Sequence, residues 1–577
     1  MKKEIAISLK KVLSNLKINL KKEEIENLIE IPPSSEIGDY AFPCFSLAKK
    51  LHRSVYPKLR SEGAKKNPHE IALEIKDKIS NKNFEDVQVS GAYINFFVDK
   101  KKFAENIIKE ILKEKENFGK SNIGRKEKTM VEFPSQNTNK PLHLGHLRNM
   151  SIGESISRIL EFNSEKVIRA NLNNDRGVHI CKSMVAYKKY GKNKKPIKKS
   201  DHFVGDFYIR FNQIVKENKD YEKKAQECLQ KWEAKDKETL DLWKKMNKWA
   251  LDGFKETYKK FGIKHDKEYY ESKIYKKGKE IVLGGLKKGI FEKKDGSIII
   301  NLEKEKLGEK VLLREDGTSL YIIQDIYLAK LKQDEYKINK SIYVVGNEQE
   351  YHFKVLFTIL LKLGFNYKNL KHLSCGMVNL PEGKMKSREG TVVDADNLIK
   401  EVQDLVKKEL TSREKISKKE LESRSLKIAL SAIKYFLLKV DSKKNMLFNP
   451  KESISFEGDT GPYLLYSYAR AFSILRKSKN KLNKNNFQIK NISEHELKLL
   501  KKLSQFPEVV SNSYNTLNPS LIANYSYQLT QIFNGFYHSC PVINSEQELF
   551  RLALVKSFRY VLENSLKLLG IEIIDKM

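Results

Sequence analysis

Hydrophobic residues recur along the 577-residue chain with two different periods, and these periods divide it into three regions. The first region opens with apolar positions at helical spacing and later alternates Val, Tyr and Phe after Gly91, in "VQVSGAYINFFVD". The alternation predicts a strand, and the Lys- and Glu-rich stretch 101–117 that follows predicts a helix. We therefore expect an N-terminal α+β domain over residues 1–117.

The second region, residues 118–410, alternates between strand and helix patterns. The apolar run "TMVEF" stops at Pro134, "HLRNMSIGESISRIL" has helical spacing, and "KVIRANL" is a second apolar run. Strand, helix and strand within about 45 residues make a βαβ unit. "SIYVVG" followed by "YHFKVLFTILLKLG" supplies another strand and helix. The pattern therefore predicts an α/β domain with a parallel sheet.

Charged segments interrupt the second region, and helical patterns follow it. We expect "KKYGKNKKPIKKSDH" to be a solvated connection and residues 205–262 to form long charged helices, so that helical insertions occupy about 190–265. From residue 411 the strand patterns disappear, and apolar residues recur at three- and four-residue intervals. Examples of this spacing are Leu426, Leu430, Ile433, Leu437 and Val440. Residues 411–577 are predicted to form an all-α helical bundle.

Composition narrows the choice of partners only in part. The chain has 109 Lys and Arg against 74 Asp and Glu, a net charge of +35, which suits a polyanion such as nucleic acid. Lysines that merely fill solvated surfaces explain the excess equally well. The five cysteines are far apart and show no CxxC spacing, which argues against structural zinc and disulfides. Because no stretch has the apolar length of a signal peptide or a membrane span, we expect a soluble cytoplasmic protein without membrane contact.

The segment "PSQNTNKPLHLGHLRN" carries the first candidate chemistry. Its two histidines, His143 and His146, flank Gly145 where the first predicted strand of the sheet gives way to a helix. The free N–H groups and dipole at such an entry favour phosphate, the glycine leaves room for a base, and both imidazoles can donate hydrogen bonds to a phosphoryl oxygen. This arrangement suits attack at the α-phosphate of ATP. The alternatives are an i, i+3 metal pair and two surface histidines, and no third metal ligand is evident nearby.

A second candidate element is the glycine-flanked basic loop "LPEGKMKSREG", which begins at residue 380. Such a loop can close over a pyrophosphate. Taken alone, it is better explained as a solvated basic turn. Its combination with the two histidines favours a phosphate-binding role.

These two elements resemble the HIGH and KMSKS signatures of class I aminoacyl-tRNA synthetases, and their surroundings resemble the arginyl-tRNA synthetases. The resemblance runs through nearly the whole chain and is carried by the segments "SSEIGDYAFPCFSLAK", "SGAYINFFVD", "VEFPSQNTNKPLHLGHLRN", "NNDRGVHICKS", "REDGTSLYIIQDI", "VVGNEQEYHF" and "GDTGPYLLYSYAR". It implies a Rossmann-type catalytic domain, an N-terminal domain that contacts the tRNA elbow, and a helical anticodon-binding domain. The implied partners are tRNA(Arg), L-arginine and ATP with Mg²⁺, without a structural metal, in a monomer that activates arginine only after tRNA has bound.

The resemblance also assigns roles at the ATP site. His143 and His146 would serve the α-phosphate, and the ATP site would further include Gly145 and, from the basic loop, Lys384, Met385 and Ser387. Ser387 stands where the family signature has a second lysine. Arginyl enzymes that lack this lysine commonly carry one just before HIGH, and Lys140 occupies that position. Lys386 is the other candidate to stabilise the leaving pyrophosphate beside Lys384, and the sequence does not rank Lys140 against Lys386.

The resemblance also implies an arginine pocket, which has an acidic end and a polar end. Tyr321 and Asp325 fall four residues apart on one helical face, where a carboxylate can accept the guanidinium fork; a helix cap or a buried pair is the alternative. The positions that match residues holding the α-amino and carboxylate groups are Glu132, Ser135, Asn137 and Gln349.

In the C-terminal region, Tyr463, Arg470 and Tyr537 can offer stacking and phosphate contacts to unpaired anticodon bases, although core packing is the commoner role for such residues.

Three other classes of protein remain possible: a nucleotidyltransferase that acts on a small metabolite, a basic RNA-binding protein without catalysis, and a class I synthetase for another amino acid. A metabolite nucleotidyltransferase needs no long helical C-terminal region. A simple RNA binder needs no acidic pocket of guanidinium size. Tyr321, Asp325 and the N-terminal region distinguish the arginine enzyme from other synthetases.

Overall fold

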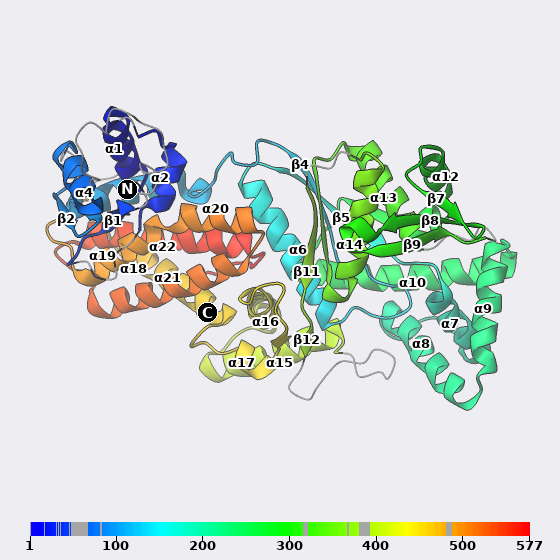
Figure 1. The fold of residues 1–577 in the computed structure, drawn as a ribbon. Helices are drawn as coiled ribbons and strands as arrows, with labels where there is room; N and C mark the ends of the chain where they lie inside the picture. The colour runs from blue at the N-terminus through cyan, green and yellow to red at the C-terminus, as the bar shows by residue number, and fades with distance from the viewer. Residues whose placement is uncertain are drawn as a thin grey trace. The chain divides into compact units, whose positions relative to one another are not determined.

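The computed structural model (Figure 1) describes residues 2–16, 18–30, 32, 34, 36–45, 47, 67–80, 84–315, 321–365, 369–379, 393–480 and 487–577. The described residues form two compact units. The first comprises those of 1–113, 482–501 and 544–554, and the second those of 114–481, 502–543 and 555–577. Among the helices of the described ranges, none is long and apolar enough to cross a membrane.

The first unit confirms the α+β class predicted for the N-terminal region. Its elements in residues 1–113 are α1 (Lys2–Asn15), α2 (Lys22–Leu28), β1 (Tyr40–Pro43), α4 (Pro68–Asp77), β2 (Asp86–Ser90), β3 (Tyr93–Phe97) and α5 (Lys100–Glu114). The strands form an antiparallel sheet in the order β1-β3-β2. The predicted strand is β3, but the prediction missed β2, which precedes it. Gly91, at a φ of 56°, lies in the tight turn that joins the two.

The second unit contains the predicted parallel sheet. Its five strands are β4 (Lys128–Glu132), β5 (Lys166–Asn173), β6 (Lys267–Tyr270), β10 (Lys340–Gly346) and β11 (Asn369–Cys375), in the order β11-β10-β4-β5-β6. All four neighbouring pairs are parallel. The strand β4 is central, and the chain continues from it to β5 on one side and later to β10 on the other. In open α/β sheets this switch point forms a crevice at the carboxyl ends of the strands.

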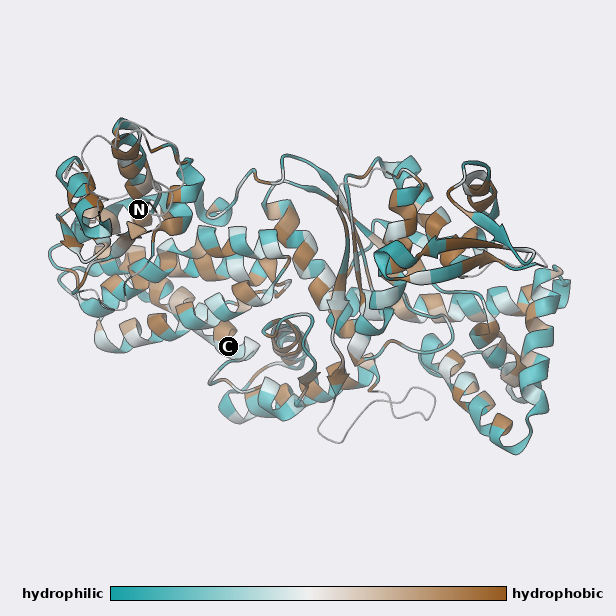
Figure 2. Ribbon diagram, in the orientation of Figure 1, coloured by the Kyte–Doolittle hydropathy of each residue, from teal (hydrophilic) through white to brown (hydrophobic). Residues whose placement is uncertain are grey.

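Four α-helices lie between β5 and β6, the last three of them within the predicted insertion of about 190–265. They are α7 (Val178–Ala186), α8 (Ser200–Glu217), α9 (Asp220–Glu233) and α10 (Lys237–Phe261). Figure 2 shows them as alternating hydrophilic and hydrophobic segments, as expected for amphipathic helices. The predicted solvated connection is only partly solvated, because Asp201 at its end has 0% exposure and the side chain of Lys199 has 17%. Both are paired with opposite charges, which makes their burial tolerable.

Two small sheets were not predicted. Strands β7 (Glu292–Lys294), β8 (Ser297–Leu302) and β9 (Gly308–Leu313) form an antiparallel sheet after α11 (Glu271–Ile274) and α12 (Lys279–Lys287). The two-residue strand β13 (Met446–Leu447) pairs with β12 (Val378–Asn379), so strands do not end at residue 410 as predicted.

The remaining α-helices apart from α6 belong to the second region and to the C-terminal region. They are α13 (Tyr321–Tyr336), α14 (Glu350–Lys362), α15 (Ala395–Arg413), α16 (Lys418–Leu438), α17 (Pro450–Ser453), α18 (Gly461–Lys477), α19 (Glu494–Ser504), α20 (Phe506–Thr516), α21 (Ser520–Ser539) and α22 (Glu548–Leu568). The first two cover the five-stranded parallel sheet, and α16 to α22 confirm the helical class predicted for the C-terminal region.

Helix α6 (Leu144–Phe162), which begins at the HxGH segment, is enclosed on several sides. It contacts β5 and β10 of the sheet as well as α16 and α20, and 14 of its 19 residues are buried. The hydroxyl of Ser155 donates to the carbonyl of Leu568 at 2.8 Å. Helix α6 therefore belongs to the core of the sheet and to the packing of the C-terminal helices at once.

Arg148 ties α6 to two neighbouring loops. Its side chain is 1% exposed, and its guanidinium donates hydrogen bonds to backbone carbonyls. The acceptors are Gly376 O at 2.7 Å, Met377 O at 3.5 Å, Asp441 O at 3.2 Å and Lys444 O at 2.8 Å. A planar fork with five N–H donors can serve acceptors on two loops simultaneously, and an ammonium cannot.

We expect Arg148→Lys to lower the free energy of unfolding by about 2 kcal/mol, because carbonyls on at least one loop lose a charged donor. Urea denaturation measures the loss. The control is Arg158→Lys on the same helix, where the side chain is 38% exposed and pairs with Glu154. That change should cost less than about 0.5 kcal/mol. Equal losses in the two variants would contradict a special role for the buried guanidinium.

Candidate functional site

The candidate site lies at the carboxyl edge of the parallel sheet. Glu132 ends β4, and the segment that follows leads to His143 at the start of α6. Glu271 follows β6 directly, and Gln349 lies just after β10. Since these strands are parallel, their carboxyl ends share one edge. The fold thus brings the predicted residues Glu132, His143 and Gln349 to the edge of the sheet that forms the crevice at the switch point.

The two histidines cap the N-terminus of α6. His143 is the N-cap residue, and its Nδ1 accepts a hydrogen bond from Gly145 N at 3.1 Å. The Nδ1 of His146 accepts from His143 N at 3.1 Å, and the ring centroids lie 3.8 Å apart. A Cβ atom on residue 145 would stand 3.0 Å from the His143 ring. Glycine at this position therefore leaves room for the folded-back ring.

Both imidazoles are held neutral. Burial lowers the pKa of His143 to about 3, aided by the charge of Lys140. Burial, His143 and Lys140 together lower the pKa of His146 well below its ordinary value. A neutral imidazole whose Nδ1 accepts a hydrogen bond carries its proton on Nε2. Each ring is therefore set to donate from Nε2 to an anionic oxygen.

The neutral state of His143 makes stability depend on pH. Between the unfolded value near 6.5 and the folded value of about 3, the unfolded chain binds the extra proton, so stability falls as pH falls. In the wild-type protein we expect the free energy of unfolding to fall by about 1.4 kcal/mol for each pH unit below 6.5. His143→Asn, which preserves a cap acceptor, should abolish this loss. Urea denaturation at pH 7.5 and pH 5.0 measures it. Parallel pH profiles for the two proteins would contradict the assignment.

The segment before α6 is fixed by two neighbours. Leu144 N donates to Val393 O and Ala395 N donates to Leu142 O, both at 3.0 Å, which forms an isolated bridge around His143 and Asp394. On another side, a Cβ atom on Gly205 of α8 would lie 2.6 Å from Pro141 Cδ and 3.6 Å from Lys140 Cα. The half-buried Lys140 is thus placed by the insertion and by the segment that begins α15. Lys384, Met385, Lys386 and Ser387 lie outside the described residues.

Glu132 is buried beside an internal cation that the sequence did not reveal. Its Oε2 lies 2.6 Å from Nζ of Lys332, which has 0% exposure and lies 4.3 Å from the ring centroid of Tyr343. Ser135, at a φ of 58°, donates through Oγ to Glu132 Oε1 at 3.5 Å. Glu132 and Ser135 therefore lie together at the end of β4, and the charge of Glu132 is already balanced.

Asp325 also has a partner inside the protein. Its Oδ2 lies 2.7 Å from His352 Nε2, and this hydrogen bond raises the pKa of the histidine. The carboxylate remains 28% exposed, so one side of it is open. The side chain of Tyr321, the first residue of α13, lies outside the described part of the chain.

Glu271 is an acidic residue near Asp325 that the sequence analysis missed. Burial raises its pKa to about 7; Arg176 and Gln324 oppose this shift, whereas Asp175 and Asp325 add to it. Gln324 Nε2 donates to its Oε1 at 3.3 Å. A buried carboxyl with a raised pKa gains when a cation binds beside it. Its position directly after β6 was the sequence signal that could have identified it.

The other predicted pocket residues are less constrained. Asn137 is half-buried, and its backbone forms an isolated parallel bridge with Asn174 after β5. Gln349 is exposed and precedes α14. Lys332 and His352 had weak signals in the sequence. Lys332 lies seven residues after Asp325, two turns along one helix, and His352 lies in a segment already noted for its resemblance.

The predicted tRNA-contacting residues lie together on the C-terminal helices. Arg470 donates to Asn534 Oδ1 at 2.7 Å, and its guanidinium lies 4.8 Å from the ring centroid of Tyr537. Asn534 Nδ2 donates to the hydroxyl of Tyr463 at 2.8 Å. Tyr463, Arg470 and Asn534 line a cavity of about 620 Å³, and Tyr537 is 38% exposed beside a second cavity. Tyr463 and Arg470 are half-buried, so none of the three predicted side chains is fully buried.

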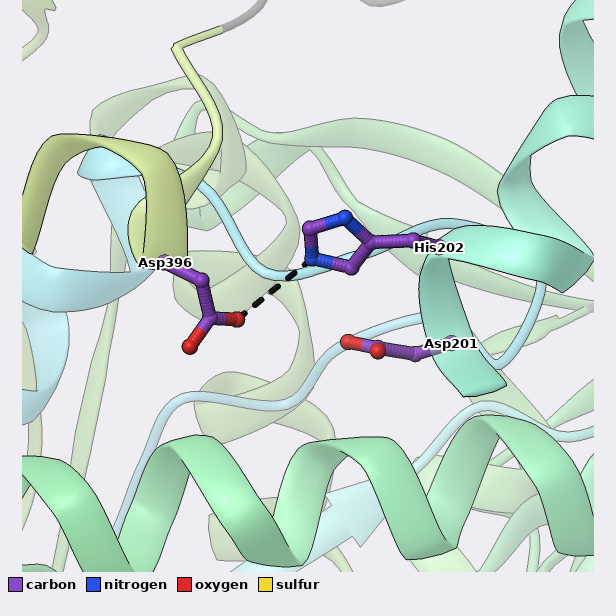
Figure 3. A group of neighbouring side chains, drawn as sticks. All are labelled: Asp201, His202 and Asp396. Atoms are coloured by element: carbon purple, nitrogen blue, oxygen red, sulfur yellow. Dashed lines mark ion pairs between the residues drawn. The ribbon is translucent and has the colours of Figure 1, made fainter. Parts of the chain in front are cut away.

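One group of side chains in the described ranges has the donor set of a metal site. It consists of Asp201, His202 and Asp396 (Figure 3). The ammonium of Lys199 lies 2.9 Å from Asp201 Oδ2 and 2.8 Å from Asp396 Oδ2. A cation of the protein thus already bridges the two carboxylates.

Comparison with known families accounts for nearly the whole chain. Residues 1–98 match the arginyl-tRNA synthetase N-terminal domain, and residues 107–449 match the catalytic domain of tRNA synthetases class I (R). Residues 464–577 match the DALR anticodon binding domain. The catalytic-domain match extends to residue 449, beyond the predicted boundary at residue 410.

Full-length relatives lead to the same family. The arginine–tRNA ligase of Treponema denticola is 46% identical over 572 residues, which cover 95% of this chain and 94% of that protein. That of Borrelia duttonii is 43% identical over 100% of this chain and 99% of that protein. The structure of the Thermus thermophilus arginyl-tRNA synthetase shares the fold, with a TM-score of 0.82 and 24% identity over 100% of both chains. The chain belongs to the arginyl-tRNA synthetases of class I.

Proposed function

We propose that the protein is an arginine–tRNA ligase that acts as a monomer in the cytoplasm. It joins L-arginine to the α-phosphate of ATP and transfers the arginyl group to tRNA(Arg). In the first step a carboxylate oxygen of arginine bonds to the α-phosphorus, and the bond to the β-phosphate oxygen breaks to release pyrophosphate. In the second step a ribose hydroxyl of the terminal adenosine bonds to the acyl carbon, and AMP leaves. ATP enters with Mg²⁺, which is held mainly by the phosphates.

The observation that carries this proposal is the pair of neutral imidazoles at the start of α6. Charge develops on the α-phosphate during adenylate formation, and fixed donors aimed at it lower the barrier without reorganisation. His143 and His146 meet this need because each uses Nδ1 as an acceptor. Lys140, whose charge acts on both rings, is placed to stabilise the departing pyrophosphate. Lys384 and Lys386 are further candidates for that charge, and Met385 and Ser387 for contacts to ATP.

The arginine pocket is proposed at the neighbouring strand ends. Asp325 and Glu271 form its acidic end, where a guanidinium can donate hydrogen bonds to both carboxylates and lower the repulsion between them. Tyr321 would add a hydrogen bond. Glu132, Ser135, Asn137 and Gln349 form its polar end. Because Lys332 neutralises Glu132, this carboxylate can orient an α-amino group without leaving an unpaired buried charge.

The proposal is tested by aminoacylation of total tRNA with each of the 20 amino acids. We expect charging with arginine alone, and arginine-dependent pyrophosphate exchange only when tRNA is present. Charging with another amino acid would overturn the arginine assignment. Nucleotidyl transfer to a small metabolite without any aminoacylation would overturn the synthetase assignment.

The C-terminal cavity gives a prediction about tRNA. We expect Tyr537→Ala to raise the KM for tRNA(Arg) about 10-fold, the scale of one lost base–aromatic stacking contact, while KM for ATP stays unchanged. Steady-state aminoacylation measures both constants. The control is Lys567→Gln on α22, which removes an exposed charge outside either cavity. An unchanged KM for tRNA in Tyr537→Ala would exclude this ring from the interface.

A further inference from the structure

A buried network of charges joins the insertion helices to the segment that pairs with HxGH. Lys199, the N-cap residue of α8, reaches Asp201 and Asp396 and also donates to Thr257 Oγ1 of α10 at 2.7 Å. Figure 3 shows His202 directed at Asp396 from the same helix. Its Nε2 lies 3.5 Å from Asp396 Oδ2 and 3.2 Å from Asp394 Oδ2.

The network balances its own charge. Its three carboxylates face three basic groups, because Lys260 of α10 adds its ammonium at 3.9 Å from Asp396 Oδ1. The hydrogen bond to Asp396 raises the pKa of His202, which favours the charged imidazolium. Burial alone would raise the pKa of Asp396, yet His202 and Lys199 hold it below its ordinary value. The group is therefore an ion-pair network in which Lys199 bridges Asp201 and Asp396, while Asp201 Oδ1, His202 Nε2 and Asp394 Oδ2 are buried without a hydrogen-bond partner.

The packing around the network depends on small residues. Asp201 has 0% exposure, and a Cβ atom on Gly253 of α10 would stand 2.3 Å from its Oδ1. Gly205, one turn further along α8, allows that helix to approach Lys140 and Pro141. The same helix therefore carries two members of the network and supports the lysine beside the histidines.

Asp394 and Asp396 lie in the segment whose backbone pairs with the start of α6. Asp394 caps α15 by accepting from Asn397 N at 2.9 Å, and it forms the isolated bridge with His143. Asp396 lies two residues further on. A shift of residues 393–396 would move the backbone partners of Leu142 and Leu144, and with them the N-cap histidine.

We propose that the Lys199–Asp396 network is a positioning device for adenylate formation, which holds residues 393–396 so that Lys140, His143 and His146 keep their geometry. Lys199 and Asp396 are positioning residues, since they act through the bridge and not on the substrate. This inference rests on the proposed function. Misplacing reacting groups by about 1 Å can cost 100-fold in rate, so a partial loosening should cost on the order of 10-fold.

The test is a double-mutant cycle on arginine- and tRNA-dependent pyrophosphate exchange with Lys199→Met, Asp396→Asn and the double variant. We expect each single variant to lower kcat on the order of 10-fold with little change in KM for arginine, and the double variant to lose no more than either. Rates are measured well below each variant's melting temperature. Asp394→Asn, which retains the cap acceptor, replaces Lys199→Met if the latter does not fold, and should also lower kcat.

The matched control is the exposed pair of Lys198, which directly precedes Lys199, and Asp206 on α8, 2.7 Å apart. Lys198→Met should leave kcat unchanged. Wild-type kcat in folded network variants, or additive losses in the double variant, would overturn the positioning role. Stoichiometric binding of Mn²⁺ or Zn²⁺ that Asp201→Asn abolishes would also overturn it, in favour of a metal site. Absence of exchange in the wild-type protein would instead refute the proposed function, and the inference with it.

Discussion

Changing Lys140 to alanine is expected to slow formation of arginyl-adenylate on the order of 100-fold or more, the scale for losing one transition-state donor. Lys140 lies three residues before His143, and its charge acts on both imidazoles. The basic loop has Ser387 where the family signature has a lysine, so the chain needs another cation for the departing pyrophosphate. Pyrophosphate exchange in the presence of tRNA measures the rate.

The binding of arginine and tRNA should hardly change in Lys140→Ala, because the lysine is assigned to the phosphate side of the site. Lys166→Ala is a suitable control, since this exposed lysine begins β5 at the opposite edge of the sheet. Comparable exchange rates in wild type and Lys140→Ala would shift the role to Lys384 or Lys386. Full exchange without tRNA in both proteins would count against the dependence on tRNA.

Asp325→Asn is expected to weaken the use of arginine by about 30-fold to several thousand-fold, a loss of about 2 to 5 kcal/mol. The substitution keeps the size of the side chain and removes the charge that a guanidinium needs. It also leaves His352 without its carboxylate partner. The ratio kcat/KM for arginine, measured by aminoacylation, gives the loss, and KM for ATP should stay nearly constant.

Asp334→Asn is the control that distinguishes an effect on the arginine pocket from a general effect on α13. Asp334 lies on the same helix, is 52% exposed and pairs with its neighbour Lys330. This variant should retain the wild-type kcat/KM for arginine. If Asp325→Asn did the same, the acidic end of the pocket would have to be assigned elsewhere, with Glu271 as the next residue to test.

The sequence predicted the elements that depend on local pattern. The βαβ unit from β4 to β5 was legible because its strands are apolar runs, Pro134 ends the first of them, and α6 repeats apolar residues at helical spacing. The HxGH element could be recognised from the sequence because its residues are adjacent in the chain. The hairpin of β2 and β3 was missed because only two residues, Gly91 and Ala92, separate the strands.

Contacts between distant residues could not be predicted. Glu132 and Lys332 are 200 residues apart, and no local pattern marks a buried pair of this kind. Lys199 and Asp201 were placed in a solvated connection because charged runs usually are solvated. Their burial depends on Asp396, 197 residues after Lys199, and no property of the connection itself reveals that partner.

The enclosure of α6 has a consequence for how the protein melts. Residues 395 to 413 form one helix, α15, so removing the predicted C-terminal region, 411–577, would cut the chain within the last turn of this helix. It would also remove α16 and α20 from α6 and expose apolar faces on both sides. When two parts of a protein pack on one shared central helix, they unfold together. Heat should therefore unfold the catalytic sheet and the packed C-terminal helices in one cooperative transition, and a ligand that stabilises either part should raise the melting temperature of both.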